Sequence, residues 1–253
     1  MNNKLKKWID MELGRVSGDK TDAKIRASLT KHNPSEISRR RKQIAYNHIG
    51  SFGWINEKLI RIYTDSSIPA NQRDSYMSSV ESGIGYVLDE LELDFKIELI
   101  GVDNIVDNYI KDAMQENLLN PSEVAKQAKF EVYRDSTKGG IPHADVILSN
   151  KNLNTYLWGW CTDLSGCMVI GYSHSPNTLR KIAKHETTHL LGNRHHHGDS
   201  RFFEDAKECG YEYVKECVGN PSCKYEKICP QCFDSIVAGF LNAEKSKGIK
   251  FFK

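Results

Sequence analysis

The middle of the chain changes its hydrophobic period several times. Residues 59–63 (LIRIY) and 95–99 (FKIEL) place apolar side chains in the pattern of strands. Between them, apolar residues recur at intervals of three and four, which predicts a helix over residues 69–91 with proline at its first position. Gly83 and Gly85 interrupt this helix, so we expect a kink or a close contact with another helix there.

The same alternation continues towards the C-terminus. Ser175-Pro176 is typical of a helix start, with serine as the N-cap and proline in the first turn. The alternation of strands with helices predicts an α/β (α+β) fold, in which a mixed sheet packs on helices. The further elements that we expect are helices over 103–118, 121–128, 176–191 and 233–244, and strands over 144–148, 157–160 and 168–172.

The N-terminal part of the chain lacks this periodicity. Residues 1–55 are basic and polar and include the run Arg39-Arg40-Arg41-Lys42. A solvated arm, an electrostatic contact with nucleic acid or an acidic partner, and a propeptide all suit such a segment, and the lack of an accompanying aromatic pattern favours the arm. We predict a basic extension over residues 1–55 and a domain over 56–253, with a cysteine-rich lobe at 198–253.

One segment carries recognisable chemistry. The sequence from His185 to His195 is HETTHLLGNRH. On a helix, His185 and His189 lie on one face and can direct two imidazoles at one metal ion. Glu186 can reach a water bound to that metal without being a ligand. Gly192 can take a positive φ and turn the chain, so that His195 returns as a third ligand.

Three protein ligands leave one position of a tetrahedral zinc open, which is typical of a catalytic site. His196 and His197 follow His195 directly, so adjacency alone does not decide the third ligand, although His195 has the expected spacing. With zinc bound, Glu186 is the candidate general base for hydrolysis by an activated water.

Composition limits the function classes. The 253 residues are 39% hydrophobic and 27% charged, which suffices for a sizeable core, and the net charge of +2 favours no particular partner. We find no long apolar run and no apolar core near the N-terminus, so we expect neither a membrane span nor a signal peptide. We therefore expect a cytoplasmic protein with no membrane partner. The hydrolytic chemistry described for zinc and Glu186 predicts a peptide or protein substrate, and a nucleic-acid partner is not favoured. The sequence does not indicate an oligomeric state.

The seven cysteines favour metal binding over disulfides, because their number is odd and the expected compartment is reducing. Cys229-Pro230-Gln231-Cys232 is a CxxC pair, a common chelating turn. Most of the cysteines lie in the last quarter of the chain, at Cys209, Cys217, Cys223, Cys229 and Cys232.

The extended histidine pattern, followed by cysteines that end in CxxC, resembles the archaemetzincins, a family of zinc metallopeptidases among the metzincins. The resemblance extends over about residues 59–236. It implies a metzincin-like fold with an active-site helix, a catalytic zinc, and an edge strand at residues 157–163 that pairs with extended substrate. It also implies a second, structural zinc. Its expected ligands are Cys217, Cys229 and Cys232 with either Cys209 or Cys223, and the family's order of ligands favours Cys209.

The chain also departs from the family pattern. His196 stands where the family has a cysteine, and Gly219 stands where the family has the methionine of the Met-turn. The Met-turn lies beneath the zinc site and supplies no ligand, so its loss does not remove the chemistry.

The sequence therefore predicts a zinc-dependent peptidase with Glu186 as general base. One alternative is a non-catalytic zinc-binding module for protein interaction, although such a site does not need a carboxylate at Glu186. The other is a zinc hydrolase that acts on a non-peptide amide, whose metal centre would have the same appearance.

Overall fold

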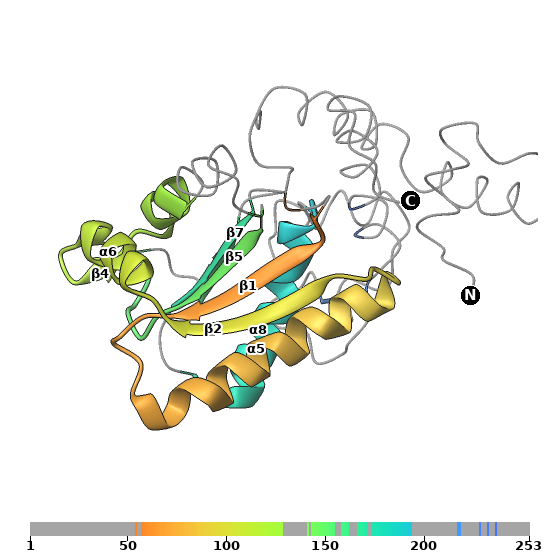
Figure 1. Cartoon of the computed structure of the whole chain (residues 1–253), viewed down its shortest axis with the longest axis horizontal. Helices are drawn as coiled ribbons and strands as arrows, with labels where there is room; N and C mark the ends of the chain where they lie inside the picture. The colour runs from red at the N-terminus through yellow and green to blue at the C-terminus, as the bar shows by residue number, and fades with distance from the viewer. Residues whose placement is uncertain are drawn as a thin grey trace, which may run out of the picture.

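The structure is a computed structural model. It describes residues 54, 57–128, 141, 143–154, 158–161, 166–171, 174–193, 217, 218, 228, 232 and 236. Most of these residues form a five-stranded sheet with helices on both of its faces (Figure 1). The fold is thus mixed α/β, as expected.

The sheet is mostly parallel. Its strand order is β2-β1-β5-β7-β6, and the four strands from β2 to β7 run parallel to one another. The fifth strand, β6, is antiparallel to β7 and forms one edge of the described sheet. The strands are β1 (Leu59–Thr64), β2 (Lys96–Val102), β5 (Ala144–Leu148), β6 (Gly159–Cys161) and β7 (Cys167–Ile170).

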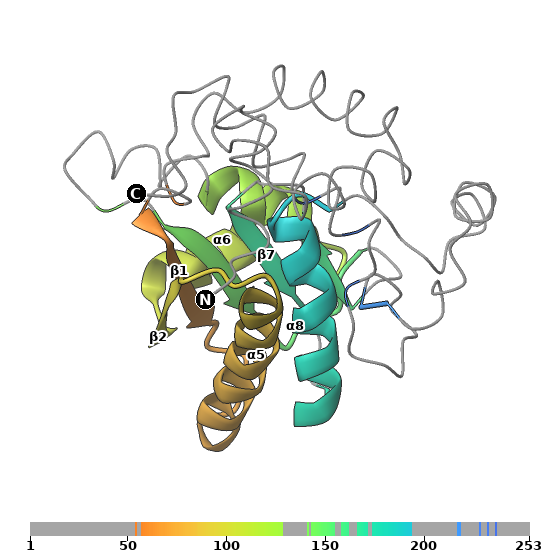
Figure 2. The same ribbon diagram turned by 90° about the vertical axis from the view of Figure 1, so that its right-hand side faces the viewer.

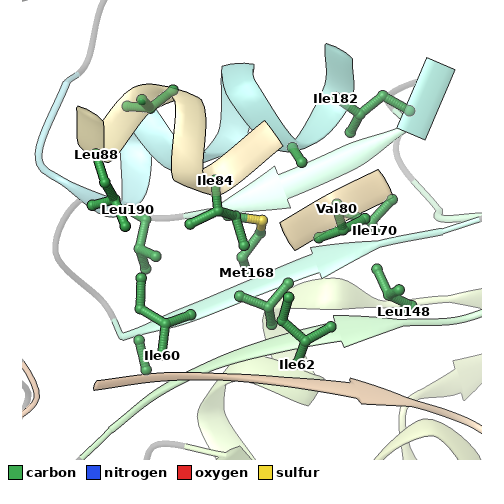
Figure 3. Close-up of a cluster of buried hydrophobic side chains, with 14 of the residues drawn as sticks. Ile60, Ile62, Val80, Ile84, Leu88, Leu148, Met168, Ile170, Ile182 and Leu190 are labelled. Atoms are coloured by element: carbon green, nitrogen blue, oxygen red, sulfur yellow. The ribbon is translucent and has the colours of Figure 1, made fainter. Parts of the chain in front are cut away.

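Two long helices, α5 (Ala70–Glu90) and α8 (Pro176–Leu190), lie side by side on one face of the sheet (Figure 2). The other face packs against α6 (Asn104–Asp112) and the helical residues 121–128. Successive strand residues point to opposite faces, so Val146 packs beneath α5 and α8, whereas Ile147 packs beneath α6. Figure 3 shows the core between the sheet and the helices α5 and α8. Its labelled side chains are Ile60, Ile62, Leu148, Met168 and Ile170 from the sheet and Val80, Ile84, Leu88, Ile182 and Leu190 from the helices.

The close helix contact expected at the glycines occurs at Gly83. A Cβ atom on Gly83 would lie 2.5 Å from the carbonyl oxygen of Arg180 and 2.8 Å from the Cβ of Ala183. A Cβ on Gly85 would meet no heavy atom within 4 Å. Only the first glycine is therefore required for the approach of α5 to α8.

The predicted helix over 103–118 is wrong beyond residue 112. Asp103 caps its start, because its carboxylate accepts hydrogen bonds from the backbone N–H groups of Ile105 and Val106. The chain then forms a short hairpin of β3 (Met114–Gln115) and β4 (Leu118–Leu119). Glu116 and Asn117 both have positive φ, at 48° and 68°, which is typical of a type I′ hairpin turn and ends the helical path.

Several expectations concern residues outside the described part of the chain. Of the predicted extension, only Trp54 is described, and it is buried with its ring centroid 5.8 Å from that of Phe95. Of the predicted helix at 233–244, only Ile236 is described, and it is buried in the core beneath α5 and α8. No helix among the described residues is long and apolar enough to cross a membrane.

Replacing Gly83 with alanine should destabilise the fold, because the added methyl group would force α5 away from the backbone of α8. We expect a loss of about 1–3 kcal/mol in the free energy of unfolding, measured by urea denaturation. Gly85→Ala is the matched control. It should be neutral or stabilising by about 0.5–1 kcal/mol, since alanine favours the helix interior. Equal losses in both variants would contradict the close contact at Gly83.

Candidate metal centre

The helix α8 has a well-defined start and end. The Oγ of Ser175 accepts a hydrogen bond from the backbone N–H of Thr178, and Pro176 is the first helical residue. The helix runs to Leu190, and Gly192, whose φ is 102°, turns the chain two residues later. The N–H of Gly192 donates to the carbonyl of His189, and the N–H of Asn193 donates to the carbonyl of Thr188.

The hydrogen bonds from Gly192 to His189 and from Asn193 to Thr188 are both 2.8 Å long and form a Schellman motif. The motif directs the chain away from the helix axis immediately after the second histidine. The sharp turn expected at Gly192 is therefore present.

The imidazoles of His185 and His189 meet one turn apart on a buried face of α8. Their Nε2 atoms are 3.2 Å apart, and their ring planes are nearly perpendicular. Two nitrogens bound to one tetrahedral zinc at ordinary lengths lie about 3.3–3.4 Å apart. The spacing of the two Nε2 atoms therefore fits two ligands of a single zinc ion.

Backbone carbonyl oxygens accept hydrogen bonds from the Nδ1 atoms of both imidazoles. The Nδ1–H of His185 donates to the carbonyl oxygen of Val218 over 2.9 Å, and the Nδ1–H of His189 donates to that of Asn193 over 2.5 Å. Because carbonyl oxygens only accept, we assign the proton of each ring to Nδ1. Each Nε2 then presents a lone pair to the other, and a cation that both can bind would stabilise this arrangement. Such carbonyl partners are typical of histidines that bind metals.

Glu186 follows the first histidine on α8, and its side chain packs against the edge strand. A Cβ on Gly159 in β6 would lie 2.7 Å from both Cγ and Oε1 of Glu186, so only glycine allows the strand to approach this side chain. Burial raises the pKa of the Glu186 carboxyl to about 8. A cation held by the neighbouring histidines would favour the charged carboxylate and act against this rise.

Two of the predicted cysteine ligands also come together. The Sγ atoms of Cys217 and Cys232 are 3.5 Å apart, and both residues are buried. Two thiolates that share a tetrahedral zinc lie about 3.8 Å apart, so this pair is close to the required spacing. The side-chain amide of Asn193 donates to the Sγ of Cys232 over 3.2 Å, which joins the cysteine pair to the end of α8.

The remaining predicted ligands lie outside the described residues. These are His195, Cys209 and Cys229, and the alternative ligand Cys223 lies outside them too. Within the described part of the chain, no group of three or more His, Cys, Asp or Glu side chains gathers around one point. The structure thus brings together a histidine pair and a cysteine pair. The third histidine ligand and the other two cysteine ligands stay predictions.

Sequence reasoning missed three contributors to this centre. Val218 acts through its backbone carbonyl, which leaves no signal in the sequence. Asn193 occupies a variable position of the histidine pattern, although an amide next to a helix-ending glycine suggests a capping contact. Gly159 lies within a predicted strand, where an isolated glycine signals a close approach of another group.

Known proteins resemble this chain in structure but not detectably in sequence. No protein-family model and no curated protein matches the sequence. The fold is similar to the crystal structure of an archaemetzincin from Methanopyrus kandleri, with a TM-score of 0.47 and 14% sequence identity. The match covers 73% of this chain and 96% of the other.

The histidine pair should bind zinc, and His189→Ala should weaken that binding strongly. The loss should exceed the roughly 10- to 100-fold cost of removing an outer partner of a ligand. His174→Ala is the control, since His174 lies next to the other end of α8 and its ring packs against Trp158. Competition with a chelator would measure the affinities. Equal affinity in the His189 variant and the wild type would contradict the assignment.

Proposed function

We propose that this chain is a zinc-dependent peptidase with a metzincin-like centre on α8. The observation that carries the proposal is the histidine pair. Its two Nε2 atoms lie 3.2 Å apart, and both Nδ1–H groups donate to backbone carbonyls. Glu186, whose side chain is buried, directly follows the first histidine in the sequence. The spacing supports zinc, and the adjacent carboxyl supports acid–base chemistry.

When bound, a zinc ion would supply a Lewis acid that polarises a substrate carbonyl and acidifies a water. Glu186 would take a proton from the attacking water onto its carboxylate and pass it to the leaving amine. The side chain of Glu186 is buried, and the glycine of β6 packs directly against it. His195 is the proposed third ligand of this zinc.

The edge strand β6 supports a peptide as the substrate. It is antiparallel to β7, and among the described strands it has a neighbour on one side. An extended peptide can add to such an edge through main-chain hydrogen bonds. Gly159 would place this peptide close to Glu186, since no side chain separates the strand from the carboxyl. The proposed substrate is therefore a peptide or protein segment in extended form.

Glu186→Ala should retain zinc and lose hydrolysis by roughly 100-fold or more, because the general base would be absent. Cleavage of a broad peptide library by zinc-loaded protein would measure this. Glu90→Gln, at the exposed end of α5, is the control and should cleave as the wild type does. Unchanged turnover in the Glu186 variant would exclude this residue as the base. Failure of every zinc-loaded protein to cleave any peptide would favour a binding module.

We also propose a second zinc held by Cys217, Cys229, Cys232 and either Cys209 or Cys223. Cys232→Ser and Cys229→Ser should each lower the zinc content from two ions per chain towards one, and each variant should unfold more easily, because such a metal contributes to folding. Elemental analysis would count the zinc. Cys209→Ser and Cys223→Ser would separate the two candidates for the fourth ligand. A wild type with no more than one zinc would exclude the second site.

A further inference from the structure

Asn193 is buried where the histidine pair and the cysteine pair meet. It follows the positive-φ glycine of the Schellman motif, so its backbone direction is fixed by the end of α8. Its carbonyl oxygen accepts the Nδ1–H of His189, and its side-chain Nδ2 contacts the Sγ of Cys232. One residue thus contacts a proposed ligand of each of the two metal sites.

The hydrogen bonds of this side chain specify its orientation. The Nδ2 atom has two hydrogens and two acceptors, which are the Oγ1 of Thr188 and the Sγ of Cys232, each 3.2 Å away. The Thr188 hydroxyl donates its own hydrogen to the carbonyl of His185, so its oxygen can accept from Asn193. A flipped amide would direct its oxygen at the Cys232 sulfur, so the observed orientation is favoured.

The sulfur of Cys232 receives a second donor as well. The Sγ–H of Cys217 points to it over 3.5 Å, in addition to the amide of Asn193. The sulfur of Cys232 therefore helps to hold the side chain of Asn193, and with it the backbone carbonyl that orients His189.

We infer that Asn193 is a positioning residue that couples Cys232 to His189, so that metal binding at the histidine pair depends on the cysteine pair. The inference rests on the proposed function only in that it needs the histidine pair to bind metal. It goes beyond that function because it joins two sites that would otherwise act separately. The coupling passes through one side chain and its own backbone carbonyl.

Co²⁺ is a suitable probe, because cysteine-bound Co²⁺ has a sulfur-to-metal charge-transfer band that histidine-bound Co²⁺ lacks. Asn193→Ala keeps the backbone carbonyl but removes the amide donors. It should weaken Co²⁺ binding at the histidine pair by roughly 10-fold, as loss of an outer partner typically does. Asn193→Asp should weaken it further, since a carboxylate would face the sulfur of Cys232.

A double-mutant cycle with Cys232→Ala tests the coupling itself. In the Asn193→Ala background, loss of Cys232 should change the affinity of the histidine pair by less than about twofold, because the link is already broken. Effects that multiply as if independent would overturn the inference. So would wild-type affinity in the Asn193→Ala protein.

Thr187→Val is the control for general loosening of α8, since the Thr187 hydroxyl donates to Ala183 within the same helix. It should lower the melting temperature and leave Co²⁺ affinity unchanged, and an equal loss in this variant would overturn the inference. If Asn193→Ala does not fold, Cys232→Ala alone should weaken the histidine pair, whereas Cys167→Ala, in β7, should not. Equal affinities in these two cysteine variants would then overturn the inference.

The proposed function and the inference can fail separately. Normal coupling without cleavage of any peptide would overturn the peptidase and leave the positioning role of Asn193 in place. Cleavage that depends on Glu186, with wild-type metal affinity in Asn193→Ala, would overturn only the inference. A wild type that binds no Co²⁺ through the histidines would overturn both.

Discussion

Two carbonyl oxygens determine whether the histidines of α8 can act together. An imidazole that is free to rotate presents either nitrogen to its neighbour, and two such rings would share a proton or turn apart. The carbonyls of Val218 and Asn193 each fix one Nδ1–H, so both Nε2 lone pairs face a common point. One carbonyl comes from Asn193 at the end of the helix, and the other comes from Val218, which lies 33 residues after His185. The proposed metal centre therefore depends on tertiary structure as much as on the histidine pattern.

The rest of the fold holds α8 in place for this purpose. The parallel strands provide an apolar surface, and α5 packs beside α8 through the contact at Gly83. On the other side, β6 approaches Glu186 closely because residue 159 has no side chain. Glycines at two positions thus set the distances of α8 from its neighbours, one towards a helix and one towards a strand. The buried carboxyl of Glu186 lies near the second of them.

Much of this arrangement could be predicted from local sequence. The alternating strands, the Ser175-Pro176 start and the turn at Gly192 each depend on residues close together in the chain, where propensity and capping decide the outcome. The helix predicted to residue 118 failed because its apolar period continues past Asp112, while Glu116 and Asn117 adopt left-handed backbone. The contribution of Val218 could not be predicted, since every residue has a carbonyl and only the fold selects which one meets His185. The approach of Cys217 to Cys232 is expected from the family resemblance alone, because the two residues lie far apart in the chain and their local sequence does not indicate a contact.

The use of main-chain acceptors has an evolutionary consequence. A substitution at position 218 cannot remove the carbonyl oxygen there, so the support of His185 survives sequence change as long as the chain keeps its path. Selection on this support therefore acts on backbone geometry and leaves no particular side chain at that position for a sequence comparison to detect. The support of His189 differs, because the coupling inferred above also involves the side-chain amide of Asn193.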